Sequence, residues 1–394
     1  MMICRKASRA ALGLVAVTLL LACCGGERGV QPHVTPPFPA RLSAWRLFTG
    51  KPAGLHPNHG VVPYDLNTPL FSDYADKFRF VWMPPGTSAA YRPDGVFDFP
   101  VGTILSKTFA FRTEPNSPDR LIETRLLVHA KSGWVGLPYV WNRAETEATL
   151  DVAADPVPVR FVDDSGHEHS TNYIIPNSNQ CKECHAQYKV MAPLGPKARN
   201  LNKTYAYADG AANELVFWTR IGYLKGSPDP SAAPRAAVWN DPSSGTLEAR
   251  ARTYLDLNCG TCHRPGGAAA TSALYLDLAS SSEENLGVCK PPVAAGRASG
   301  DLLFDVVPGR PEESILVRRM ESTEPKVMMP EIARTLPHGE GIELVRAWIA
   351  SLRGACVAAA PPGAHRQSVQ ADPHAARPGF GEPMRENMVA KLGP

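Results

Sequence analysis

The sequence lacks a hydrophobic run long enough to cross a membrane as a helix. Its apolar N-terminal stretch, residues 10–21, is twelve residues long, whereas a membrane-spanning helix needs about 20. Arg5, Lys6 and Arg9 precede it, and basic residues before a short apolar run are typical of a secretory signal peptide. We therefore expect residues 1–22 to be a signal that is removed on export.

An excess of charge of one sign is also missing. The chain has 41 Lys and Arg residues against 38 Asp and Glu residues, and the three basic residues of the expected signal account for the difference. The mature chain would then be near neutral, without the basic surface that nucleic-acid binding requires. Nucleic acid is therefore not an expected partner.

Cysteine is scarce, with nine residues in 394, yet four of the nine lie in two copies of one motif. Residues 181–185 and 259–263 both read Cys-x-x-Cys-His, the attachment signature of a c-type haem, in which the histidine binds the iron. The sequence therefore predicts two covalently bound haems c. The haem-binding cysteines are Cys181, Cys184, Cys259 and Cys262, and the iron ligands are His185 and His263.

Two other interpretations of the cysteine pairs explain less. A thioredoxin-like dithiol would lie in a βαβ unit and would not need a histidine after each second cysteine. A four-cysteine zinc site would have 74 residues between its pairs, whereas such sites usually have about 15 to 20.

The end of the signal indicates a lipid anchor. Leu20, Leu21, Ala22 and Cys23 resemble the lipobox of bacterial lipoproteins, in which the cysteine becomes lipidated. We expect a lipid on Cys23, followed by a flexible Pro- and Gly-containing tether over residues 23–54. Cys23 is not followed by aspartate, which favours the outer membrane. The alternative is an ordinary signal peptide.

The remaining cysteines suggest a disulfide. Cys4 leaves with the signal, so Cys24, Cys289 and Cys356 have no assigned role. Because disulfides form outside the cytoplasm, a bond between Cys289 and Cys356 is plausible.

Residues 55–180 read as a β-rich domain. Phe78, Phe80 and Trp82 alternate with other residues, similar runs occur at 103–112, 121–129, 137–141 and 157–162, and turn signals separate them. This spacing predicts a small sandwich or barrel. Residues 181–244 would form the first haem-binding segment, with a helix at about 210–224.

Residues 245–356 show helical periodicity. Leu247, Ala251, Tyr254 and Leu255 lead into the second motif, and a second apolar stripe begins at Ile342. This order resembles a class I cytochrome c, so the expected fold class is α+β: a β-rich domain followed by an all-α cytochrome c-like domain. Residues 357–394, with His365 and His374, read as a disordered tail.

Each haem iron needs a second axial ligand to act as a low-spin electron carrier. For the second haem we expect Met329, which precedes Pro330 and is favoured over Met328. A methionine ligand should raise the reduction potential. For the first haem the candidates stay open: Met191, a histidine of the β region (His129, His167 or His169), or no ligand.

Several long stretches resemble a family of proteobacterial dihaem c-type cytochromes that join a β-rich region to two haem motifs. The resemblance covers about residues 55–355 and is carried by residues 64–74, 123–127, 137–142 and 195–202. It implies a cytochrome and adds no catalytic residue.

The expected function is a periplasmic, lipid-anchored electron carrier whose partners are periplasmic or membrane redox proteins. The alternative is a dihaem peroxidase-like enzyme with an open first haem. A third interpretation, in which the β region docks a redox partner, is compatible with the electron carrier.

Overall fold

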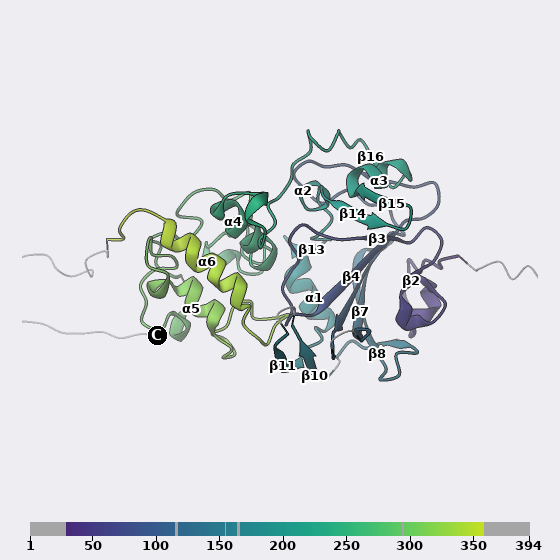
Figure 1. Ribbon diagram of the computed structural model, residues 1–394, viewed down its shortest axis with the longest axis horizontal. Coiled ribbons are helices and arrows are strands. Elements are labelled where there is room, and N and C mark those ends of the chain that lie inside the picture. Colours follow the sequence, from purple (N-terminus) through teal and green to yellow (C-terminus); the bar gives the residue numbers. More distant parts are fainter. Residues whose placement is uncertain (1–28, 115–116, 154, 164–165, 294, 358–394) are drawn as a thin grey trace, which may run out of the picture. The chain divides into compact units, whose positions relative to one another are not determined.

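The computed structural model describes residues 29–357, apart from 115, 116, 154, 164, 165 and 294. Residues up to Cys356 form one compact unit. Its centre is a six-stranded antiparallel sheet in the order β3-β4-β6-β7-β8-β9 (Figure 1). The strands are β3 (Val62–Tyr64), β4 (Asp76–Trp82), β6 (Ile104–Phe111), β7 (Arg120–Ala130), β8 (Gly133–Trp141) and β9 (Ala148–Leu150).

The N-terminal stretch covers one face of this sheet. Phe80 and Trp82 of β4 point to that face and pack in one core cluster with Trp45 and Leu42. Trp45 is fully buried and its Nε1 donates to the Tyr139 hydroxyl at 2.7 Å. Leu150 of the edge strand β9 donates its backbone N–H to Ala40. Residues 29–54, which composition suggested as part of a tether, are therefore packed against the sheet.

The other sheet face is covered by later parts of the chain. Val81 and Leu105 point to it and share a core cluster with Leu201, Leu215 and other residues of the segment after the first motif. A further cluster joins Phe109 and Phe111 to Phe161 and Tyr173 of the β10–β11 ladder. Both faces of the sheet are therefore buried. In β6, for example, Ile104 packs in the core on one face and Leu105 in the core on the other.

Shorter elements surround the sheet. The two-stranded ladders pair β1 (Phe48–Thr49) with β2 (His56–Pro57), β10 (Val157–Val162) with β11 (Glu168–Tyr173), β12 (Ala186–Gln187) with β13 (Val190–Met191), β14 (Thr204–Tyr207) with β15 (Gly210–Asn213), and β5 (Ala89–Ala90) with β16 (Leu224–Lys225). The α-helices are α1 (Ser178–His185), α2 (Ala198–Leu201), α3 (Glu214–Arg220), α4 (Leu247–Asn258), α5 (Ile315–Glu321) and α6 (Gly339–Ser351).

The expected helices around the second motif form where their apolar stripes lie. Leu255 of α4, Val317 of α5 and Val345 of α6 are all buried in one cluster. Gly341 lets α6 approach α4, since a Cβ at this position would lie 2.3 Å from the Tyr254 ring.

The prediction of a β-rich sandwich or barrel followed by an all-α class I cytochrome c-like domain is wrong. The six-stranded sheet is open, because its edge strands β3 and β9 do not pair with each other. The three helices α4, α5 and α6 have 12, 7 and 13 residues and leave most of 245–356 in loops and short 3-10 turns. Residues 210–224 form β15 and the short α3 rather than one helix. Gly- and Pro-rich stretches between the stripes have no apolar period to support helices.

The predicted disulfide between Cys289 and Cys356 is confirmed, with 5.0 Å between the two Cα atoms. It joins the end of the compact unit to the loop between the second motif and α5.

Removing this bond should destabilise the folded protein. The cysteines are 67 residues apart, and a loop of that size corresponds to about 4 kcal/mol of chain entropy. Cys289→Ser should lower the free energy of unfolding by about 2–4 kcal/mol in urea denaturation. Cys356→Ser should match it, and the double variant should lose no more. Additive losses would mean that the two thiols act separately.

Candidate haem site

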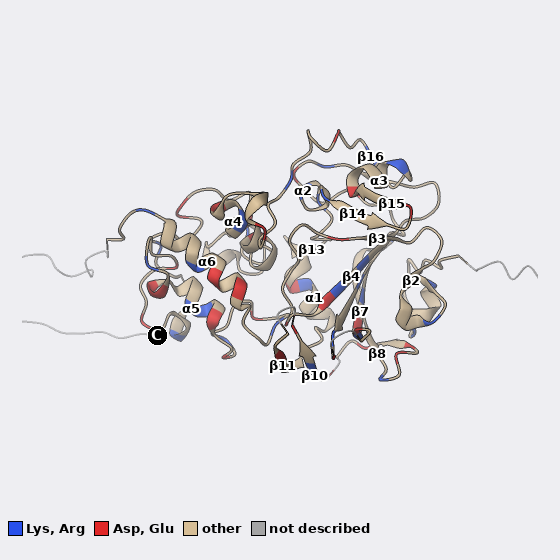
Figure 2. Ribbon diagram, viewed as in Figure 1, with Lys and Arg blue, Asp and Glu red and all other residues tan. Residues whose placement is uncertain are grey.

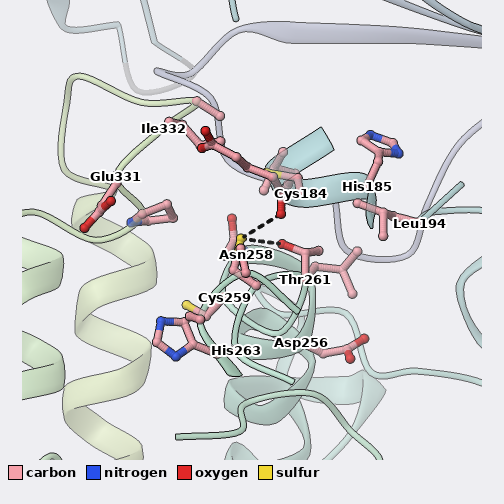
Figure 3. A pocket seen from close by; sticks show the side chains of 18 of the residues that line it. Cys184, His185, Leu194, Asp256, Asn258, Cys259, Thr261, His263, Glu331 and Ile332 are labelled. Atoms are coloured by element: carbon pink, nitrogen blue, oxygen red, sulfur yellow. Dashed lines mark hydrogen bonds between the residues drawn. The ribbon is translucent and has the colours of Figure 1, made fainter. Parts of the chain in front are cut away.

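The two motifs line one cavity of about 540 Å³. Cys181, Cys184 and His185 face it from one side, and Cys259, Cys262 and His263 from the other. Figure 3 shows Cys184 and His185 above Cys259 and His263 around this pocket. The structure therefore brings together all six predicted haem-binding side chains.

The first motif is held on α1, beside strand β8. Asn177 and Gln180 form a capping box that starts the helix. Gly136 of β8 makes room for it, since a Cβ there would lie 3.3 Å from the Cys181 Cβ and 3.1 Å from the Met191 Cε. The sequence between the hairpin β10–β11 and the hairpin β12–β13 thus places the first thiol directly against the sheet.

The second motif begins where α4 ends. The N–H groups of Cys259 and His263 bond to the carbonyls of Leu255 and Cys259, both at 2.8 Å, so the motif continues as a tight turn. Gly260 is required in this turn, because a Cβ would lie 2.8 Å from the Asp256 carbonyl oxygen.

Both motif histidines are oriented by a backbone carbonyl. The Nδ1 atom of His185 lies 2.9 Å from the Ala192 oxygen, and that of His263 lies 3.1 Å from the Leu274 oxygen. Burial lowers the pKa of His185 to about 4 and also lowers the pKa of His263. Each ring is therefore neutral at neutral pH, with Nδ1–H donating and Nε2 left as a lone-pair donor for a metal.

The segments that follow the two motifs are bonded to each other. Tyr188 donates its N–H to the Gly266 carbonyl at 2.8 Å, and the Gln187 side chain donates to the Pro265 carbonyl at 3.0 Å. The Cys262 thiol donates to the Glu183 carbonyl, with 3.8 Å between sulfur and oxygen, and its interaction with the Cys184 thiol lowers the pKa of Cys262 to about 7 and raises that of Cys184. The two attachment sites therefore adjoin at their second cysteines.

Met329 lines the cavity, whereas the neighbouring Met328 is buried away from it. The backbone of Met329 is fixed on both sides: its N–H donates to Arg319 at 2.8 Å, and its carbonyl accepts from Arg334 at 2.7 Å. Met320 of α5 also lines the cavity. Sequence reasoning missed Met320, because on α5 it has the spacing of an ordinary core residue.

Of the candidate ligands for the first haem, Met191 lines the cavity and the three histidines do not. His129 bonds to the Phe99 carbonyl at 2.9 Å and stacks on Trp134. His167 and His169 both lie beside the Asp163 carboxylate. His129, His167 and His169 are thus engaged elsewhere in the β region.

A buried carboxylate ties the β region to the loop that carries Met329. Asp73 accepts hydrogen bonds from the N–H groups of Thr335 and Leu336 at 2.7 and 2.8 Å, and from the Thr335 hydroxyl at 2.9 Å. Sequence reasoning did not assign Asp73 a role, although it lies in the stretch 64–74 that carries the family resemblance. The contact spans more than 260 residues, a distance at which sequence pattern gives no signal.

The alternative interpretations of the cysteine pairs find no support in the geometry. Within the described residues, no three His, Cys, Asp or Glu side chains cluster as a zinc site would require. The first motif lies between two antiparallel hairpins rather than in a βαβ unit. Cys23 and the tail histidines lie outside the described residues.

Comparisons with known proteins add no further guide. No known family model, curated protein or solved structure matches the chain. Across the part of the chain that the structure describes, no helix combines the length and apolarity that crossing a membrane requires.

A buried acid next to the site should make stability depend on pH. Glu214 is fully buried and accepts from the Asp65 N–H at 2.9 Å, and burial raises its pKa from 4.5 to about 9. The folded chain thus keeps a proton that the unfolded chain releases. Stability should fall as pH rises from about 5 to 9, by about 1.4 kcal/mol per pH unit for this group.

Glu214→Gln should remove that fall, since the amide resembles the protonated acid. Urea denaturation at several pH values would check this, with the exposed Glu343→Gln as control. Equal pH slopes for the natural protein and Glu214→Gln would contradict it.

Proposed function

We propose that this chain is an exported, lipid-anchored protein that binds two haems covalently and carries electrons between redox partners. The observation that carries the proposal is the matched pair of histidines, each tied through Nδ1 to a carbonyl and each in one cavity with two free thiols. A carbonyl partner on Nδ1 leaves Nε2 as the iron ligand.

The cavity suits a large apolar ring. Leucines from the sheet and from the α4–α6 region line it, including Leu105, Leu127, Leu274 and Leu316. Bound haem would supply one-electron redox chemistry. The residues of the chain would attach it through four cysteines, orient the histidines, and exclude water with these leucines. No residue is assigned a catalytic role.

The adjoining motifs support a carrier with two centres. Because the Cys262 thiol bonds to the Glu183 carbonyl, next to Cys184 in the first motif, the two groups attached there would be neighbours inside one protein. The resemblance to dihaem c-type cytochromes points the same way. The partners would be periplasmic or membrane redox proteins.

An enzyme with an open first centre is the second candidate. It is favoured because three of the four predicted sixth ligands of the first haem lie outside the cavity lining: His129, His167 and His169. Met191 is the predicted ligand that lines the cavity, and the first centre would be open if Met191 does not bind the iron. Electron paramagnetic resonance of the oxidised protein would distinguish the two functions. Two low-spin signals fit a carrier, and a high-spin signal that shifts with cyanide fits the enzyme.

Mass spectrometry of the protein matured in a host that attaches haem c should find two haems. Replacing Cys181 and Cys184 by alanine should remove one, and replacing Cys259 and Cys262 should remove the other, because each pair forms its own thioether bonds. Cys289→Ser is the matched cysteine control and should keep both. A natural protein without covalent haem would overturn the proposed function.

The axial role of Met329 predicts a specific spectroscopic loss. Met329→Ala should abolish a methionine-to-iron charge-transfer band of the ferric protein and lower the potential of the second haem, because a neutral sulfur ligand favours ferrous iron. Met328→Ala should keep the band, although it removes a buried side chain. A band that survives in the double variant Met329→Ala, Met191→Ala would point to Met320 instead.

A further inference from the structure

Three basic side chains form a row across the sheet face that lines the cavity. Arg79 on β4 lies directly opposite Lys107 on β6, and Lys107 lies opposite Arg125 on β7. All three line the same cavity as Cys181 and His185. Figure 2 shows basic residues in blue on β4.

Such a row is unfavourable by itself. Like charges directly opposite one another on antiparallel strands repel, and a cation removed from water needs a partner of opposite charge. The question is therefore whether the protein supplies enough carboxylates.

Arg125 is fully paired. Its Nε and Nη2 atoms donate to the two carboxylate oxygens of Glu123 at 2.8 and 2.5 Å, and the Tyr173 hydroxyl donates to the same carboxylate at 2.7 Å. Glu123 thus forms its hydrogen bonds with Arg125 and Tyr173, and its effect on Lys107 is weaker than the effect of the nearby cations.

Arg79 is only half paired. Its Nη1 donates to Asp65 at 2.6 Å, but its buried Nη2 has no hydrogen-bond partner within the described residues, although the side chain is only 4% exposed. The Asp65 carboxylate also pairs with Lys203, whose Nζ lies 3.0 Å from its Oδ2. Glu214 is close by, but its raised pKa of about 9 leaves it uncharged at neutral pH.

Lys107 has no carboxylate partner among the described residues. The Lys107 Nζ atom lies over the ring of Phe109, 4.5 Å from the ring centroid. The Arg125 guanidinium lies over the same ring at 4.2 Å. Burial and the neighbouring charges of Arg79, Lys77 and Arg125 lower the pKa of Lys107 well below its usual value, so the acids of the chain do not compensate a charge at this position. An anion bound in the cavity would compensate it, because Lys107 and Arg79 both line the cavity.

We propose that Arg79 and Lys107, which Arg125 flanks, bind the carboxylate groups of the first haem. This rests on the proposed function. The Cys181 thiol lies against Gly136 of β8, and the row runs from β7 to β4, about 5 to 15 Å farther across the sheet at the usual strand spacing. A porphyrin held by Cys181 would have its propionates on the edge opposite its thioether bonds, and Arg79 and Lys107 are the residues of the row that could hold them.

The test is the reduction potential of the first haem in the intact two-haem protein. Lys107→Met removes the cation that would form beside a bound propionate and favour the ferrous state, so the ferric–ferrous equilibrium should shift three- to tenfold toward ferric iron. In a one-electron couple each factor of ten is about 59 mV. Lys107→Arg should keep the natural potential, and the potential of the second haem should stay unchanged in both variants.

Lys131→Met is the matched control, because Lys131 is exposed beside the β7–β8 turn and is not part of the cavity lining. The propionate bending bands of the resonance Raman spectrum should shift in Lys107→Met and stay in place in Lys131→Met. Lys107→Met should fold, since Lys107 is half-buried and Met is apolar and of similar length.

Two results would overturn the inference while leaving the proposed function intact. In the first, Lys107→Met carries two haems but has the potential and Raman bands of Lys131→Met. In the second, inorganic phosphate or nitrate shifts the first potential saturably, and Lys107→Met abolishes that shift, so the row binds free anions. A protein without covalent haem would instead refute the proposed function.

Discussion

The arrangement of the site depends on the contact between the two segments that follow the haem motifs. Two hydrogen bonds, from Tyr188 to Gly266 and from Gln187 to Pro265, hold segments together that are nearly 80 residues apart. Without this contact the motifs would belong to two separate pockets. With it, the sheet forms one wall of a single cavity, and α4, α5 and the loops next to them form the other.

The rest of the fold supports those walls. The N-terminal stretch seals the outer face of the sheet through Trp45 and Leu42, which leaves the inner face for α1 and the cavity. On the opposite wall, Asp73 reaches from the β region to the loop after Met329. The β-rich and helical parts therefore share one structure rather than forming independent domains, which is why 29–356 is a single compact unit.

Local patterns were sufficient to predict the parts that depend on neighbouring residues. The strands around Phe80 and the helices ending at Asn258 and Ser351 follow from apolar alternation and helical spacing. The motif residues and the Cys289–Cys356 bond were found from residue type and from counting cysteines.

The features that were missed depend on long-range pairing. Residues 29–54 contain too few apolar residues to show a period, so their Pro and Gly content suggested a tether. Lys107 and Arg125 were assigned no role, because sequence does not reveal that this second sheet face is also covered. The open sheet could not be told from a barrel, since closure depends on whether the edge strands meet.

The position of Cys262 beside the first motif has a consequence for the order of assembly. The Cys262 thiol reaches the Glu183 carbonyl, next to Cys184, only when both motifs have folded against each other. In an oxidising compartment, a chain that folded before receiving its cofactors would be open to a cross-link between the motifs, and this would block both attachment sites at once. If the chain binds haem as proposed, attachment would therefore have to act while the two motifs are still apart, or these thiols would have to stay reduced until both haems are in place.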